Sequence, residues 1–172
     1  MKKAGCHTIQ FGIESSEQAA LDAAQKRLQI NKAQQTLLWC RQVGIQAFGN
    51  FIIGMPSQGQ ESLLKTGKFA RQIGCSNAVF STLVPDVGTL LRRKLIAEGR
   101  IEDKMTRFSS TDKIFPRPMN GMTTEKLAAV RRKVMFDFYL HPSFLFNNFV
   151  KARSFYELRR RILYGFNVLR SL

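Results

Sequence analysis

Acidic residues are scarce in this chain of 172 residues, and so are several residue types that commonly carry chemistry. Lysine and arginine total 27 against 12 aspartates and glutamates, which gives a net charge of +15 at pH 7. There are only two histidines, three cysteines and one tryptophan. A charge of this size indicates an anionic partner such as a membrane surface, a nucleic acid or a phosphorylated ligand, but does not choose among them.

The few cysteines argue against two common kinds of site. Cys6, Cys40 and Cys75 lie far apart, without the spacing of a metal site, and their odd number argues against a disulfide framework. We expect each of them to be a small buried apolar residue. No nucleophile–base triad is visible either. We therefore assign no catalytic residue and no metal ligand, and expect structural roles for His7 and His141, the latter as a cap or a surface residue.

Long apolar runs are also missing. No run of about 18 apolar residues predicts a membrane-spanning helix. The basic N-terminus is not followed by the apolar core and cleavage site of a signal peptide. We therefore expect a cytoplasmic protein, with peripheral attachment to a membrane as an option. The apolar fraction of 44% includes 14 phenylalanines, which is enough for a packed core, and we expect Trp39 in that core.

One pattern occurs three times: basic residues, a glycine, then an apolar run. It reads "MKKAGCHTIQFGIES", "CRQVGIQAFGNFIIGM" and "ARQIGCSNAVFSTLVP". Cations favour the negative end of a helix, and glycine ends the helix in the left-handed conformation. The apolar run that follows predicts a buried strand, and near-continuous runs are typical of parallel strands covered by helices. Gly5, Gly44 and Gly74 mark the three expected helix ends.

Helices are expected between these runs, over residues 16–26, 31–43, 61–73 and 89–98. Asn31 is expected to cap the second helix, with Gln34 completing a capping box. In the third helix, small and apolar side chains share one face at helical spacing; they are Leu63, Gly67 and Ala70. Strands alternating with helices predict the α/β class.

The first expected strand, over 7–13, follows only the stub of a helix. Right-handed strand–helix units close onto neighbours on both sides, so we expect the upstream neighbour of this strand to lie outside the chain. An unpaired apolar edge would invite another chain. The alternative is a three-stranded α/β domain that simply begins here.

The character of the sequence changes after about residue 104. We divide the chain into a strand–helix region, 1–104, and a basic, aromatic-rich helical extension, 105–172. In the extension, Thr123 can cap a helix that Pro142 ends. Four residues form its apolar stripe; they are Leu127, Val130, Val134 and Phe138. A second amphipathic segment follows from Ser154, which either packs on the rest of the chain or rests on an anionic membrane surface.

In parallel α/β folds ligands bind at the carboxyl ends of the strands. Glu14 and Ser15 close the first strand, where a carboxylate can accept hydrogen bonds from a ribose hydroxyl or an ammonium group. The alternative is that the pair only begins the next helix. Further along the chain, Lys26 and Arg27 can bind a carboxylate or phosphate, or are simply solvated.

The other two strand ends are less distinctive. Gly54 permits close approach by a flat ligand, or else serves a tight turn before Pro56. Leu83, Val84 and Pro85 can offer backbone groups and a flat wall to an adenine ring, or else form a buried strand end and a turn.

Three segments together resemble the second half of radical S-adenosylmethionine enzymes: "AGCHTIQFGIESSEQAAL", "CRQVGIQAFGNFIIGMP" and "FSTLVPDVGTLLRRKLIAEGRI". Among these enzymes, the segments most resemble the group that carries an N-terminal cobalamin-binding domain. That group includes the anaerobic magnesium-protoporphyrin cyclase and proteins that modify hopanoids. "MTTEKLAAVRRKVMFDFYLHPSF" is similar to their C-terminal extension, so the resemblance covers nearly the whole chain.

The resemblance implies the last three strand–helix units of a partial (βα) barrel, followed by a helical extension. In such enzymes a four-iron four-sulfur cluster is held by CxxxCxxC after the first strand, and S-adenosylmethionine lies across the strand ends. Glu14 and Ser15 match the motif for the methionine or ribose part. The matches on the next two strands are Phe51, Ile53 and Gly54 near the adenine, and Leu83, Val84 and Pro85 at the sixth strand.

The chain departs from this pattern. CxxxCxxC is absent, so the iron–sulfur ligands, the first three strands and the cobalamin domain are missing. The turn "GLPGET" is "GMPSQG" here, with Ser57 and Gln58 in place of Gly and Glu, and "GIESGS" is "GIESSE", with Ser16 in place of Gly.

We therefore expect a truncated or split portion of such an enzyme that contributes part of the S-adenosylmethionine site, is inactive alone, and takes its N-terminal half from another chain. The alternative is a non-enzymatic basic module that binds an anionic membrane surface or a partner chain. Nucleic-acid binding is the weakest hypothesis, because the aromatic residues lie on apolar faces rather than among the basic ones.

Overall fold

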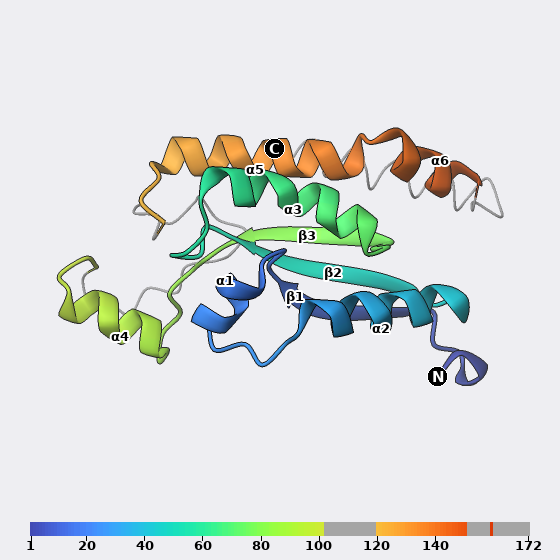
Figure 1. Cartoon of the computed structure of the whole chain (residues 1–172), viewed down its shortest axis with the longest axis horizontal. Coiled ribbons are helices and arrows are strands. Elements are labelled where there is room, and N and C mark those ends of the chain that lie inside the picture. The colour runs from blue at the N-terminus through green and yellow to red at the C-terminus, as the bar shows by residue number, and fades with distance from the viewer. Residues whose placement is uncertain (102–119, 151–158, 160–172) are drawn as a thin grey trace.

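A computed structural model describes residues 1–101, 120–150 and 159 of the chain. Its centre is a parallel sheet of three strands, β1 (Thr8–Glu14), β2 (Gln46–Ile53) and β3 (Asn77–Thr82), in the order β1-β2-β3 (Figure 1). The α/β class is confirmed. The sheet is open, and these three strands do not close into a barrel.

Helices follow each strand, as the repeated pattern predicts. Two of them lie between β1 and β2, namely α1 (Gln18–Ala23) and α2 (Ile30–Gln42). After β2 comes α3 (Gln60–Gln72), and after β3 comes α4 (Leu90–Ala97). The described part of the extension contains α5 (Thr124–Tyr139) and α6 (Pro142–Val150).

The three predicted helix-ending glycines are confirmed. Gly5, Gly44 and Gly74 have φ angles of 87°, 70° and 85°, in the left-handed region that glycine adopts without steric cost. The element before Gly5 is a short 3-10 helix, Lys2–Ala4, with both lysines in its last turn. The pattern of cations, glycine and apolar run therefore marks three real transitions from helix to strand.

The expected N-cap at Asn31 is wrong. The cap residue of α2 is Gln29, and Asn31 lies in the first turn, where its Oδ1 accepts a hydrogen bond from the N–H of Lys32 at 2.8 Å. The side-chain oxygen of Gln18 accepts a hydrogen bond from the N–H of Ile30 at 3.0 Å. Because α1 supplies this acceptor, α2 can begin at Ile30, and Asn31 is left inside it.

The expectation that Trp39 belongs to the core is also wrong. Its side chain is 57% exposed, because α2 turns Ala33, Leu37 and Cys40 toward the sheet. These positions follow helical spacing, which leaves Trp39 on the solvent side. Of the cysteines, Cys40 and Cys75 are buried as expected, whereas Cys6 is half-buried.

The hydrophobic core lies on one face of the sheet. Burial alternates along β2 and β3, so successive side chains point to opposite faces. Phe51 and Phe80 stack in the core with ring centroids 5.4 Å apart, and α3 and α5 contribute apolar residues to the same cluster. On the other face, Gln10 and Val79 are exposed and Asn50 is half-buried. The expected covering of the strands by helices therefore holds for one face in the described residues.

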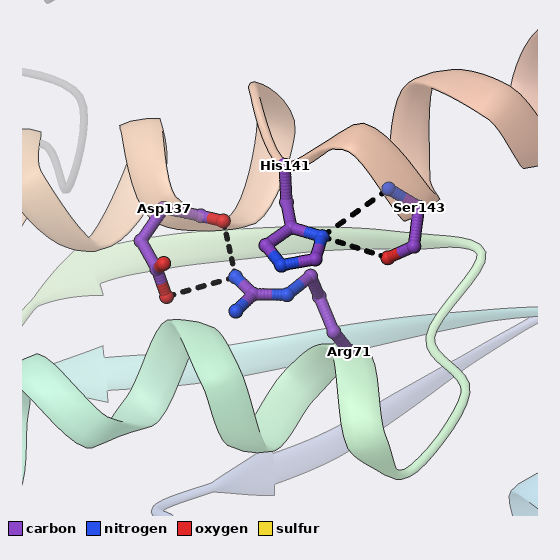
Figure 2. Close-up of polar contacts among 4 residues, drawn as sticks. All are labelled: Arg71, Asp137, His141 and Ser143. Atoms are coloured by element: carbon purple, nitrogen blue, oxygen red, sulfur yellow. Dashed lines mark hydrogen bonds and ion pairs between the residues drawn. The ribbon is translucent and has the colours of Figure 1, made fainter.

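Helix α5 packs along α3 (Figure 1). Its four predicted stripe residues are all buried, which confirms the stripe. The two backbones come close at Gly67 of α3, where an added Cβ would lie 2.7 Å from the carbonyl oxygen of Val134. Figure 2 shows Arg71 of α3 reaching Asp137 of α5, donating hydrogen bonds to its carbonyl and, at 2.8 Å, to its carboxylate.

The two edges of the sheet differ. At β3, α5 covers the outer edge: the hydroxyl of Tyr139 donates to the carbonyl of Ala78, and Nε of Arg131 donates to the carbonyl of Phe80 at 2.8 Å. Burial lowers the pKa of Arg131. In the described residues, β1 pairs with β2 alone, which agrees with the expected place of the first strand at an edge.

The junction after α5 also follows the prediction. The helix ends at Tyr139, α6 begins at Pro142, and His141 caps α6. Nδ1 of His141 accepts a hydrogen bond from the N–H of Ser143 at 3.2 Å and lies 2.8 Å from its hydroxyl (Figure 2). The amphipathic segment predicted from Ser154 lies outside the described residues, apart from Arg159. Of the helices described, none has the length and apolar character needed to cross a bilayer.

The close approach at Gly67 generates a prediction. Gly67→Ala places a methyl group against the backbone of α5, so we expect the free energy of unfolding to fall by about 1–3 kcal/mol in chemical denaturation. Gly59→Ala, just before the same helix, is the matched control, because no atom lies within 4 Å of its added Cβ. Equal stability of the two variants would contradict the helix contact.

Candidate functional site

The chain leaves β1 through an unusual turn centred on Glu14. Glu14 has a φ of 68°, and the N–H of Ser15 donates to the carbonyl of Ile13 at 2.9 Å, which closes a γ-turn. The register between β1 and β2 shifts between Gly12 and Glu14. A γ-turn with a positive central φ is rare and strained for a residue that has a Cβ. The backbone is therefore bent at one of the predicted site residues.

The turn brings the carboxylate of Glu14 back over Gly12. Oε1 of Glu14 lies 2.8 Å from Nζ of Lys26, and the two side chains are 20% and 40% exposed. A Cβ added to Gly12 would lie 2.6 Å from this carboxylate oxygen and 3.2 Å from the ammonium nitrogen. The missing side chain at Gly12 thus leaves space for an ion pair beside the open face of the sheet.

Two amide side chains lie further along the same face. Nε2 of Gln10 on β1 donates to Oδ1 of Asn50 on β2 at 2.8 Å. The strand register places Gln10 beside Phe48 and Asn50 beside Val79. The open face therefore combines hydrogen-bonding groups with apolar surface, the mixture found in sites for small polar ligands. Gln10 and Asn50 are not among the site residues predicted from the sequence, where a polar residue inside each apolar run is the available signal.

At the end of β2, Gln58 connects two strand ends. Its side-chain oxygen accepts hydrogen bonds from the N–H groups of Gly54 at 3.1 Å and Met55 at 3.0 Å. Its Nε2 donates to the hydroxyl of Ser15 at 3.1 Å. The backbone carbonyl of Gln58 in turn accepts a hydrogen bond from Asn120 at 3.1 Å. Gln58 is 1% exposed, and the sequence indicates it only as a departure from the family's turn.

The predicted residues Glu14 and Ser15 have different surroundings. Glu14 lies at the open face, whereas Ser15 is fully buried and its hydroxyl accepts hydrogen bonds from Gln58 and from the N–H of Glu17. The side chain of Ser15 therefore holds the turn together. Contact of either residue with a cofactor stays a prediction.

The predicted residues of β2 lie mainly in the core. Phe51 and Ile53 are 1% and 0% exposed and point to the buried face, away from Glu14 and Asn50. Gly54 has a φ of 93°, and its added Cβ would meet Leu127 at 3.0 Å. The predicted contact of these residues with an adenine ring is not tested by this arrangement, but the two apolar side chains do not line the open face.

The predicted residues after β3 extend its pairing with β2 by one backbone hydrogen bond. The N–H of Leu83 donates to the carbonyl of Ile53 at 3.0 Å. Leu83 and Val84 are half-buried and Pro85 is buried. The structure therefore brings this segment to the end of β2, and its contact with a ligand stays a prediction.

The cysteines are unsuited to iron–sulfur ligation. Burial raises the pKa of the Cys75 thiol to about 12, and burial together with the neighbouring Cys6 raises the pKa of Cys40. Because a metal ligand is a thiolate, ligation at either buried thiol would require the loss of a proton that the raised pKa holds more tightly. Across the described residues, no three histidine, cysteine, aspartate or glutamate side chains gather as a metal site.

Comparison with known proteins relates the chain to methyltransferases. No protein-family model matches the chain. It is 30% identical over 156 residues to an uncharacterized methyltransferase from Pyrococcus horikoshii, covering 90% of this chain and 34% of that protein. It is 28% identical over 120 residues to a cytidylyl-2-hydroxyethylphosphonate methyltransferase from Streptomyces wedmorensis, covering 66% of this chain and 22% of that protein.

The chain is similar to methyltransferases. It spans about a third and about a fifth of the lengths of these two curated relatives. Their names mention neither radical chemistry, nor an iron–sulfur cluster, nor cobalamin, nor the cyclase and hopanoid reactions of the group that the sequence resembles.

The γ-turn at Glu14 can be tested through stability. Glu14→Gly and Glu14→Ala both remove the ion pair with Lys26, but only glycine adopts a positive φ without steric cost. We expect the glycine variant to be more stable than the alanine variant by about 1–2 kcal/mol in chemical denaturation. The same pair of substitutions at exposed Lys68, inside α3, is the control and should favour alanine.

Burial of Cys75 generates a second prediction. Because its raised pKa leaves almost no thiolate at about pH 8, a thiol alkylating reagent should label half-buried Cys6 first. Labelling of Cys75 should appear only after denaturation, as followed by peptide mass spectrometry. Rapid labelling of Cys75 in the folded chain would show that the thiol is accessible.

Proposed function

We propose that this chain is the C-terminal portion of a radical S-adenosylmethionine methyltransferase and supplies one side of the S-adenosylmethionine site. The observation that carries the proposal is the exit of β1, where a strained turn aims Glu14 at an open sheet face in a chain similar to methyltransferases. Strained backbone at a strand end is typical of ligand-binding sites.

Two kinds of group on this chain suit such a cofactor. The Glu14 carboxylate can accept hydrogen bonds from ribose hydroxyls or from the ammonium group of the methionine part. Lys26, its ion-pair partner at 2.8 Å, can turn to the carboxylate of the same amino-acid group. A carboxylate and an ammonium side by side thus complement a ligand that carries both charges.

The residues present do not fit an iron–sulfur cluster. The three cysteines of the chain lack CxxxCxxC spacing, and two of them are buried, neutral thiols. The cluster of a radical S-adenosylmethionine enzyme, and the cobalamin of the resembling group, would have to be held by another segment or another chain. We therefore assign no step of the reaction to this chain and expect it to be inactive alone.

The partner segment is proposed to join at β1. At the opposite edge, Arg131 and Tyr139 already take up carbonyls of β3, whereas β1 has β2 as its one neighbour in the described region. The next long helix, α2, together with its C-cap residue, exposes large apolar side chains, namely Leu38, Trp39 and Val43. A strand added to β1 with its helix against α2 would bury both features.

Binding of S-adenosylmethionine to the isolated chain tests the proposal. By isothermal titration calorimetry, we expect the chain to bind S-adenosylmethionine or S-adenosylhomocysteine, and Glu14→Gln to weaken binding by about tenfold through the loss of charge-assisted hydrogen bonds. Glu98→Gln, at the residue that caps the C-terminal end of α4, is the matched control, because among the described residues this carboxylate pairs with exposed Lys94 and half-exposed Arg100.

Two results would count against this function. Absence of binding by the wild-type chain, with a folded circular-dichroism spectrum, would remove the cofactor site from this portion. Formation of a stable cluster after anaerobic reconstitution with iron and sulfide would contradict the assignment of the cluster to another segment. The wild-type chain is expected to develop no iron–sulfur absorbance.

A further inference from the structure

The γ-turn at Glu14 needs an interaction that keeps it in place. Residues other than glycine remain at a strained positive φ only where the surrounding contacts fix them. The ion pair with Lys26 is partly exposed and therefore a weak constraint. The buried contacts of the next residue, Ser15, are the stronger candidates.

A chain of buried hydrogen bonds runs from this turn to the end of β2. The hydroxyl of Ser15 accepts the N–H of Glu17 at 3.1 Å on one side and Nε2 of Gln58 at 3.1 Å on the other. The oxygen of the same Gln58 amide accepts the N–H groups of Gly54 and Met55. Since Gln58 is 1% exposed and Ser15 is 0% exposed, water does not compete for these bonds.

We propose that Gln58 is a positioning residue that holds the Glu14 turn, and with it the Glu14 carboxylate, at the open face of the sheet. Gln58 does not touch the open face itself; it acts through Ser15, the residue that follows Glu14. The functional part of this inference rests on the proposed function, because it takes Glu14 as the group that meets S-adenosylmethionine.

The chemistry of the amide tells which replacements keep the link. A side chain at position 58 must accept hydrogen bonds from two backbone N–H groups and must also bond to the Ser15 hydroxyl. A glutamate, the residue of the family's turn at this place, keeps both, because Ser15 can rotate its hydroxyl and donate to the carboxylate. Methionine has a similar length but offers only a weak acceptor, so it breaks the link.

The first experiment needs no ligand. Amide hydrogen exchange by NMR should show exchange at Ser15 and Glu17 faster by about tenfold in Gln58→Met, because the turn loses its buried constraint. Exchange at Val134 in α5 should be unchanged. Gln58→Glu should retain the wild-type rates at the turn. The matched control is Gln60→Met, an exposed glutamine two residues on.

The second experiment tests whether Gln58 acts through Glu14. We expect Gln58→Met to weaken S-adenosylmethionine binding by about tenfold in the wild-type background, and Gln58→Glu to restore it. In the Glu14→Gln background, Gln58→Met should have little further effect, since the carboxylate that it positions is gone. A residue that only stabilised the fold would weaken binding equally in both backgrounds.

The outcomes separate the two proposals. Unchanged exchange at Ser15 and Glu17 in Gln58→Met would overturn the positioning role, as would equal losses of binding with and without the Glu14 carboxylate. If the wild-type chain does not bind S-adenosylmethionine but Gln58→Met still frees the turn, the proposed function fails and Gln58 remains the residue that holds the turn.

Discussion

The geometry of the site depends on the hydrogen bonds of one side chain, that of Gln58. It is almost completely buried, so its amide must find protein partners for both its oxygen and its nitrogen. It finds them at the ends of two neighbouring strands, Ser15 after β1 and Gly54 and Met55 after β2. Asn120, from the segment before α5, bonds to its backbone. Three parts of the chain therefore meet at Gln58: the exit of β1, the turn after β2 and the segment before α5.

The two faces of the sheet carry different kinds of side chain, because burial alternates along the strands. The face that carries Phe51 and Phe80 is closed by α3 and α5 and provides stability. The opposite face carries polar groups, Gln10 and Asn50 along the strands and Glu14 at the exit of β1. Because the stabilising contacts lie on one face, the other is left with room for polar chemistry.

Much of the fold could be predicted because its signals are local. Gly5, Gly44 and Gly74 end helices for a reason that each residue carries itself, namely freedom to adopt a positive φ. The buried stripe of α5 likewise follows from helical spacing. The start of α2 could not be predicted in this way, because it depends on an acceptor from Gln18 in another helix.

The site was less predictable from the sequence, because its geometry depends on contacts between distant parts of the chain. The position of Glu14 at a strand end was visible in the sequence, but the γ-turn and its contact with Lys26 depend on tertiary structure. Gln58 read as a departure from a motif, whereas its amide makes three buried hydrogen bonds. Phe51 and Ile53 belong to a strand that reaches the site, yet the period of two turns both side chains into the core.

The unlike edges of the sheet have a consequence for how such a chain can be lengthened by evolution or by protein engineering. Arg131 and Tyr139 occupy the carbonyls beyond β3, so an insertion there would have to displace α5 first. Sequence fused ahead of Thr8 would displace none of these bonds. Gene fusion, gene fission and circular permutation should therefore be tolerated on one side of this sheet and penalised on the other.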